Sequence, residues 1–178
     1  MFANKQDALK PHDVAVVLAL AVKGNDPSVA TYSEIGHTLG LSSSTTHESV
    51  DRLQRAGLLR PGSRNANVHE LRNFLEHGVR AAFPPAIGQT ARGVPTAYSG
   101  PELSGLFDSS TSMVWPDPKG KVRGVSLTPL YPKATELPEK DPEIYNALTL
   151  VDALRVGQAR ERNAALSALD KVLGVKNG

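Results

Sequence analysis

The sequence predicts a mainly α-helical protein built from three segments. Apolar residues recur at helical spacing in the N-terminal half and again near the C-terminus, whereas the middle is rich in glycine, proline, serine and threonine. We therefore expect a three-helix domain over 7–83, an irregular region over 84–140 with one β-hairpin near 113–127, and C-terminal helices over 141–174.

The first helix is expected over 10–23. Pro11 suits the first turn of a helix, where its missing N–H costs no hydrogen bond, and Gly24 can end the helix. One face is apolar along this length, and it is formed by Val14, Val17, Leu18 and Ala21. That face should pack on the core.

A short second helix should follow. Ser33 can cap it, and Glu34 then lies in the first turn, where the helix dipole favours a carboxylate. Ile35 and Leu39 supply its apolar face. Gly40 can end it, because a residue without a side chain adopts the left-handed conformation at little cost.

A third helix is expected to run to about residue 56. Leu41 should be a buried staple at its start, and Ser42 or Ser43 should be its cap. Its apolar face comprises Thr46, Val50 and Leu53, whereas its outer face comprises Ser43, Ser44, His47, Glu48 and Asp51. Two short helices joined by a glycine turn, the second polar outside, are typical of a helix-turn-helix that reads DNA.

The run L-S-S-S-T-T-H-E-S-V-D-R-L-Q-R-A-G-L-L, residues 41–59, carries a family resemblance. It resembles the recognition helix and following strand of winged-helix transcription regulators of the MarR type. The resemblance extends over 10–60 and implies a winged helix-turn-helix whose recognition helix enters the major groove.

On this interpretation the recognition helix and the segment after it bind double-stranded DNA. The residues expected to face base edges are Ser43, Ser44 and His47. The residues expected to face phosphates are Thr45, Arg52, Arg55, Arg60 and Arg64. Each also has an ordinary alternative: the hydroxyls can serve as caps alone, His47 can simply face solvent, and the arginines can form surface ion pairs.

A conventional wing is not expected after this helix. Residues 60–65 are turn-like, but Val68 begins a new apolar pattern at helical spacing, and Asn67 with Glu70 forms a capping pair at its start. We therefore expect the wing to be truncated or replaced by a helix.

The expected hairpin in the irregular region pairs a strand at 113–115 with one at 121–127. Lys119 and Lys121 lie in its turn, and Arg123 lies close by. Such a turn can act as a displaced wing, or it can be an ordinary soluble turn.

The C-terminal helices begin at Asp141, a good cap followed by proline, and Gly157 separates the two. They can complete the core or join two subunits. We favour dimerisation, because lysine and arginine exceed the acidic residues by only 20 to 18, and a lone half-site reader with so little positive charge should bind weakly.

Several classes of protein are disfavoured. The chain has no cysteine, and His69-Glu70 lacks the second histidine of a zinc-protease helix. No phosphate-binding glycine loop or activated-serine motif occurs. The longest apolar run, 14–22, is too short to span a bilayer. We expect a cytoplasmic protein that is not an enzyme, has no catalytic residue, binds neither metal nor cofactor, and does not associate with membranes.

These observations favour a dimeric, sequence-specific DNA-binding transcriptional regulator, most simply a repressor. The alternative is a protein-binding adaptor, such as the antitoxin and autoregulator of a toxin–antitoxin module, in which the middle region wraps a protein partner.

Overall fold

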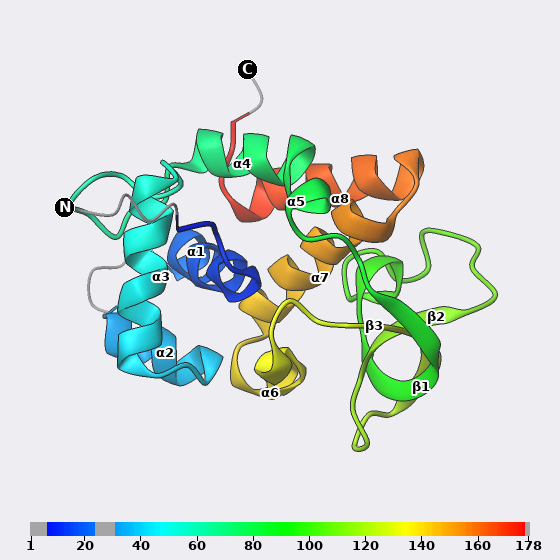
Figure 1. The fold of residues 1–178 in the computed structure, drawn as a ribbon. Coiled ribbons are helices and arrows are strands. Elements are labelled where there is room, and N and C mark those ends of the chain that lie inside the picture. The colour runs from blue at the N-terminus through cyan, green and yellow to red at the C-terminus, as the bar shows by residue number, and fades with distance from the viewer. Residues whose placement is uncertain (1–6, 24–30, 177–178) are drawn as a thin grey trace.

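The computed structural model describes residues 7–23 and 31–176, and it is mainly helical with a small three-stranded sheet (Figure 1). The helices of the N-terminal half are α1 (Pro11–Lys23), α2 (Tyr32–Leu39), α3 (Ser43–Arg55), α4 (Val68–His77) and α5 (Val79–Ala82). The strands are β1 (Ile87–Pro95), β2 (Ser112–Pro116) and β3 (Val122–Leu127), with the short 3-10 helix η1 (Ala97–Ser99) between β1 and β2. The remaining elements are η2 (Pro132–Glu136), α6 (Leu137–Lys140), α7 (Pro142–Val156) and α8 (Ala159–Val172).

Helix α1 has the predicted position and is buried along most of its length. Every residue from 13 to 20 is buried, and α1 contacts α2, α3 and α7. The apolar face is therefore wider than the predicted stripe, because α1 is covered on more than one side.

The cap of α2 differs from the prediction. Thr31, not Ser33, is the N-cap: its hydroxyl accepts a hydrogen bond from the Glu34 N–H at 3.2 Å, and the Glu34 carboxylate accepts one from the Thr31 N–H at 3.0 Å. This reciprocal capping box satisfies two backbone donors, which a cap at Ser33 would leave open. Gly40 ends the helix in the left-handed conformation, as predicted.

Helices α2 and α3 approach closely at Gly36. A Cβ atom at this position would lie 2.7 Å from Oγ1 of Thr46 and 3.0 Å from the carbonyl oxygen of Leu41. The missing side chain thus allows the two helices to pack. Leu41 itself is half-buried rather than fully buried.

The segment after α3 contains little strand structure before the next helix begins. Residues 58–67, which we call the 58–67 turn, contain one β-bridge, between Leu59 and Ala66, before α4 begins. The predicted side-chain cap at Asn67 is wrong, because Asn67 has φ −79° and ψ 89°, and its side chain makes no capping bond. This backbone lies outside the conformation from which a cap reaches the first helical turn.

The middle of the chain contains a closed three-stranded barrel instead of a hairpin. Strand β1 pairs antiparallel with β3 over its first part and with β2 over its last part, and β2 and β3 lie parallel to each other. The hairpin predicted near 113–127 is therefore wrong. A hairpin needs antiparallel partners, and each of these strands finds its antiparallel partner in β1.

Helix α7 passes between the N-terminal helices and the barrel (Figure 1). All but a few of its residues are buried, and they join α1, α4 and the barrel in one apolar cluster. Helix α8 packs on α7, and its Asp170 receives a hydrogen bond from Nε of Arg72 on α4 at 2.6 Å. Of the two roles considered for the C-terminal helices, α7 takes part in the core, because most of its residues are buried. Dimerisation stays a prediction.

The fully buried carboxylate of Asp152 links α7 to the barrel. One oxygen accepts hydrogen bonds from Oγ1 of Thr96 at 2.7 Å and from Nε1 of Trp115 at 2.6 Å, and the other accepts one from Nη1 of Arg155 at 2.8 Å. Arg155 also donates to the carbonyl oxygens of Phe83 and Pro84. Burial raises the pKa of this carboxyl above its usual value, although Arg155, Thr96 and Trp115 act in the opposite direction. Donors from three separate segments therefore meet at one buried carboxyl group.

Replacing Asp152 with Asn should strongly destabilise the fold. The change leaves the buried Arg155 guanidinium without its counter-charge, and we expect the free energy of unfolding to fall by about 3–5 kcal/mol. Urea unfolding measures the loss. As a matched control, Asp108→Asn in an exposed loop should change stability by less than about 0.5 kcal/mol. Equal effects of the two substitutions would contradict this account of the network.

Candidate nucleic-acid interface

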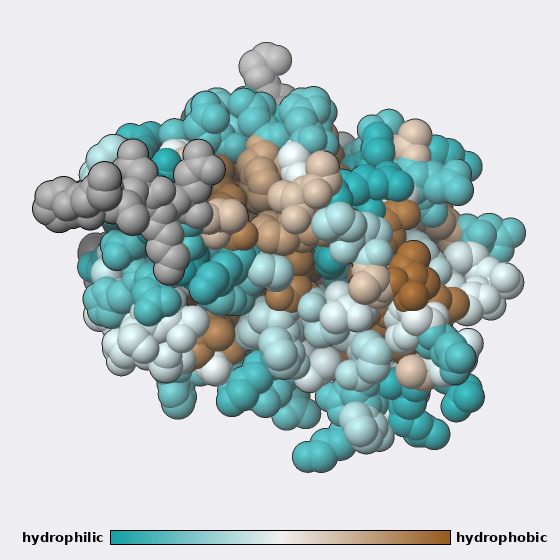
Figure 2. Space-filling view, viewed as in Figure 1, coloured by the Kyte–Doolittle hydropathy of each residue, from teal (hydrophilic) through white to brown (hydrophobic). Residues whose placement is uncertain are grey.

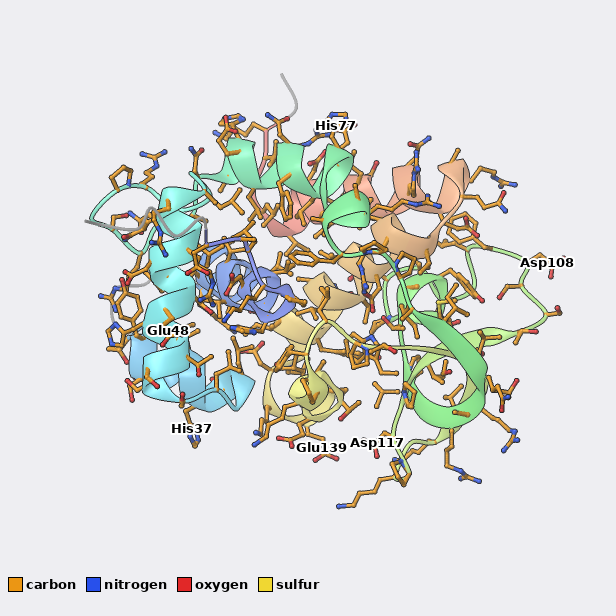
Figure 3. The ribbon with its side chains drawn as sticks, in the orientation of Figure 1. His37, Glu48, His77, Asp108, Asp117 and Glu139 are labelled. Carbon is orange, nitrogen blue, oxygen red and sulfur yellow. The ribbon has the colours of Figure 1, made fainter. Side chains whose placement is uncertain are left out.

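The polar outer face of α3 is exposed. Its side chains are Ser43, Ser44, His47, Glu48 and Asp51, and all five residues are exposed. The opposite face packs on α1 and α2. Figure 3 labels Glu48, one of these residues, on α3. The structure thus brings the three residues predicted to read bases onto one accessible surface.

Serine and threonine hydroxyls gather at the N-terminus of α3. Ser42 is the cap: its hydroxyl accepts a hydrogen bond from the Thr45 N–H at 3.1 Å and donates one to Oγ1 of Thr45 at 2.8 Å. The hydroxyls of Ser42 and Ser44 lie 3.2 Å apart. Because Ser42 provides the cap, Ser43 and Ser44 are not needed for that role. Thr45 is half-buried, but its hydroxyl proton is not used by the bond from Ser42.

His47 is held by an aromatic contact that sequence reasoning did not identify. The ring of Tyr32 meets the His47 ring edge-on, with centroids 4.9 Å apart, and the Arg64 guanidinium lies 5.6 Å from the Tyr32 centroid. Tyr32 therefore orients one predicted base reader and one predicted phosphate contact. No local sequence pattern links a ring at the start of α2 to side chains so far along the chain.

The structure removes Arg52 from the predicted phosphate contacts. Arg52 is 3 % exposed, and it donates from Nε to one oxygen of Asp13 and from Nη2 to the other, each at 2.8 Å. Ser49 donates to the same carboxylate at 2.6 Å. A guanidinium that is buried and bonded at both ends of a carboxylate has no open side for a phosphate. Its role is to fix α3 against α1.

The environment of Asp13 favours its charged form. Burial by itself raises the pKa of this carboxyl, but hydrogen bonds from Arg52, the Lys10 N–H and Ser49 outweigh burial and hold the pKa below its usual value. The ion pair therefore persists at neutral pH.

The other predicted phosphate contacts lie at the surface. Arg55 has a side chain that is 62 % exposed and pairs with Asp7 at 3.2 Å. Arg60 is exposed, and Arg64 is half-buried beside Tyr32. Since Glu48 and Asp51 share the outer face of α3, positive charge on this surface is modest.

An open hollow lies elsewhere, between the end of α3 and α4. It is lined by Leu9, Ala56, Leu58, Glu70, Asn73, Phe74, His77 and Gly78. Figure 2 shows apolar atoms in this area, below α4. None of the predicted site residues lines the hollow, so it is separate from the candidate interface.

Replacing Arg52 with Met should destabilise the fold because it leaves the buried Asp13 carboxylate without a counter-charge. We expect a loss of about 3–5 kcal/mol in urea unfolding. The matched control Arg55→Met removes an exposed arginine of the same helix and should cost at most about 1 kcal/mol. Adding Asp13→Leu to Arg52→Met should recover much of the loss, since the buried charge is then gone. If the double variant is no more stable than Arg52→Met, the unpaired Asp13 carboxylate is not the cause of the lost stability.

Lowering the pH should reduce the free energy of unfolding, because the Asp13 carboxylate becomes protonated. A carboxyl whose pKa is lower in the folded state stabilises the protein above its unfolded pKa of about 4, and this contribution disappears as the pH falls through the folded value. Urea unfolding between about pH 6 and pH 2 should therefore show decreasing stability. The decrease should be shallower in Asp13→Asn. The same pH dependence in both proteins would exclude this contribution.

Comparisons of the chain with protein-family models, with curated protein sequences and with solved structures give no match. None of the helices within 7–23 and 31–176 has the length and apolar character needed to cross a membrane. Over the same residues, no three or more histidine, aspartate or glutamate side chains come together in a way that could hold a metal ion.

Proposed function

We propose that this chain is a sequence-specific DNA-binding transcriptional regulator in which α3 is the recognition helix. The observation that carries the proposal is the uncovered outer face of α3. The barrel, α7 and α8 all lie on the other side of the N-terminal helices (Figure 1), so the protein's own C-terminal half does not cover this face.

The chemistry of that face suits base edges. The Ser43 and Ser44 hydroxyls can donate or accept, and His47 can donate to the N7 or O6 acceptors of guanine. Glu48 and Asp51 can accept from the amino group of cytosine. These groups lie on one helix whose opposite face is fixed by the buried Asp13–Arg52 pair, so their positions are set before DNA binds.

Contacts with the phosphate backbone complete the proposed mode of binding. Thr45 can donate its hydroxyl, and Arg55, Arg60 and Arg64 can supply charge around the end of α3 and the 58–67 turn. On this proposal the arrangement acts as a MarR-like winged helix with a minimal wing. We propose a homodimer, because one recognition helix reads only one half-site, and a repressor, because a dimer seated on its operator blocks access to that DNA.

Titration of the protein with DNA from upstream of its own gene, at several salt concentrations, tests the proposal. A regulator should bind this DNA more tightly than a scrambled duplex of equal length, and its affinity should fall steeply with salt. Equal affinity for both duplexes, with a stoichiometric protein partner that copurifies, would instead indicate a protein-binding adaptor.

Replacing His47 with Ala should reduce discrimination between sites. Loss of one base contact should narrow the difference in binding free energy between operator and scrambled DNA by about 1–3 kcal/mol. His77→Ala is the matched control. His77 is exposed on α4, outside the proposed interface, and Figure 3 shows it at the upper edge of the molecule, whereas His37 of α2 lies at the lower edge. This substitution should leave discrimination unchanged. If His47→Ala shows the same difference in binding free energy between the two duplexes as the wild-type protein, His47 does not contact a base.

A further inference from the structure

A β-bulge turns Ile87 outward at the start of β1. The register of β1 against β3 shifts between Ile87 and Thr90, so two residues of β1 lie opposite the single residue Ser126. A Cβ atom on Gly88 would lie 2.7 Å from Oγ of Ser126, so this close approach requires glycine. Ile87 is 58 % exposed, and Leu106 is the only other large apolar side chain exposed among the described residues.

The bulge places Ile87 on the same face of the barrel as two arginines. Directly opposed residues of neighbouring strands project from the same face, and residues 123, 125 and 127 share one face of β3 because they alternate along it. The opposed pairs are Ile87 with Leu127, Thr90 with Val125, and Arg92 with Arg123. Leu127 is buried, and we call the other five residues the β1–β3 strip. The strip therefore has an apolar end and a cationic end.

The cationic end of the strip lacks a negatively charged partner. Arg92 and Arg123 are exposed, and among the described residues neither makes an ion pair. Like charges directly opposite each other destabilise a sheet. Charged residues can also protect open sheet edges, but this barrel is closed and has no such edge. Neither role accounts for the two arginines, whereas a carboxylate bound between them would remove their repulsion.

Two lysines add positive charge beside Arg92. Lys119 and Lys121 are exposed in the connection between β2 and β3. This connection is fixed to β1, because the Asp117 N–H donates to the Arg92 carbonyl oxygen at 2.9 Å. The Asp117 carboxylate in turn accepts a hydrogen bond from the Lys119 N–H at 2.8 Å. The cationic end is thus formed before any partner binds.

The surroundings of the strip favour a short acidic segment over a nucleic acid. The strip has no aromatic ring on which a base could stack. Glu136 interacts electrostatically with Asp117, and Figure 3 shows Glu139 and Asp117 along the same edge of the molecule. A long polyanion that crosses this edge would be repelled by these carboxylates. An extended peptide advances about 3.3 Å per residue, as a strand does, so a segment of about six residues is as long as the strip.

We propose that the β1–β3 strip binds an extended acidic segment of a protein partner. Carboxylates of the segment pair with Arg92 and Arg123, and an apolar side chain near its other end covers Ile87. Every second side chain of an extended segment projects to the same side, so one side of the segment can supply both kinds of contact. The proposal does not depend on DNA binding by α3, because the barrel lies on the other side of the N-terminal helices (Figure 1).

A synthetic peptide with two leucines followed by two glutamates at alternate positions, separated by serines, tests the proposal. Fluorescence anisotropy measures its binding to the full chain. The double substitution Arg92→Gln with Arg123→Gln should weaken binding about tenfold, because two exposed ion pairs are lost. Ile87→Ser should weaken it by a similar factor, because less apolar surface is covered. Replacing both glutamates of the peptide with glutamine should weaken binding to the wild-type protein as much as the double substitution does.

Matched substitutions outside the strip serve as controls. Arg160→Gln with Arg162→Gln on α8 removes the same charge from an exposed surface, and Leu106→Ser removes an exposed apolar side chain. Both should leave the affinity for the peptide unchanged. The unfolding temperature of Arg92→Gln with Arg123→Gln should not decrease, because the change removes a like-charge pair. Weaker peptide binding by this variant therefore reports on the strip and not on the fold.

Three outcomes would overturn the inference. The first is a wild-type protein that does not bind the peptide, and the second is binding that neither the double arginine substitution nor Ile87→Ser weakens. The third is binding of duplex DNA or of anionic lipid vesicles, but not of the peptide, that the double arginine substitution abolishes. That result would assign the strip to a different class of partner.

Discussion

The buried Asp152 carboxylate holds the architecture together. It receives donors from β2, from the residue that follows β1, and from α7 itself, so the barrel and the central helix share one polar contact inside an apolar core. A charge in such a place is tolerated only when its hydrogen bonds are complete. This requirement restricts how the barrel can sit on α7, and through α7 it sets the position of the barrel relative to α1.

The Asp13–Arg52 pair places the same requirement on α3, the proposed recognition helix. Apolar packing of α3 on α1 is compatible with small rotations of α3, whereas two hydrogen bonds between a guanidinium and a carboxylate are directional. The pair therefore determines which side of α3 faces outward. The positive charge of Arg52 is thereby used inside the protein.

The helices of the N-terminal half could be predicted because their signals are local. Proline at the start of α1, glycine at the end of α2 and serine at the cap of α3 act within a few residues, and so does the spacing of Thr46, Val50 and Leu53. The strand β1 gave no such signal, since its exposed and glycine-rich residues do not alternate between apolar and polar. Its length and its two partners follow from contacts with segments far along the chain.

The sequence by itself determined the helical class, the helix-turn-helix spacing and the polar outer face of α3, because each depends on periodicity and caps within one element. Only the tertiary structure decided which charged side chains are buried and which are exposed. Arg52 and Arg55 are three residues apart on one helix, yet one is buried and the other exposed, because Asp13 of α1 lies beside the first. Likewise, the opposition of Arg92 to Arg123 depends on strand register, which is set by the closure of the barrel and not by any local pattern.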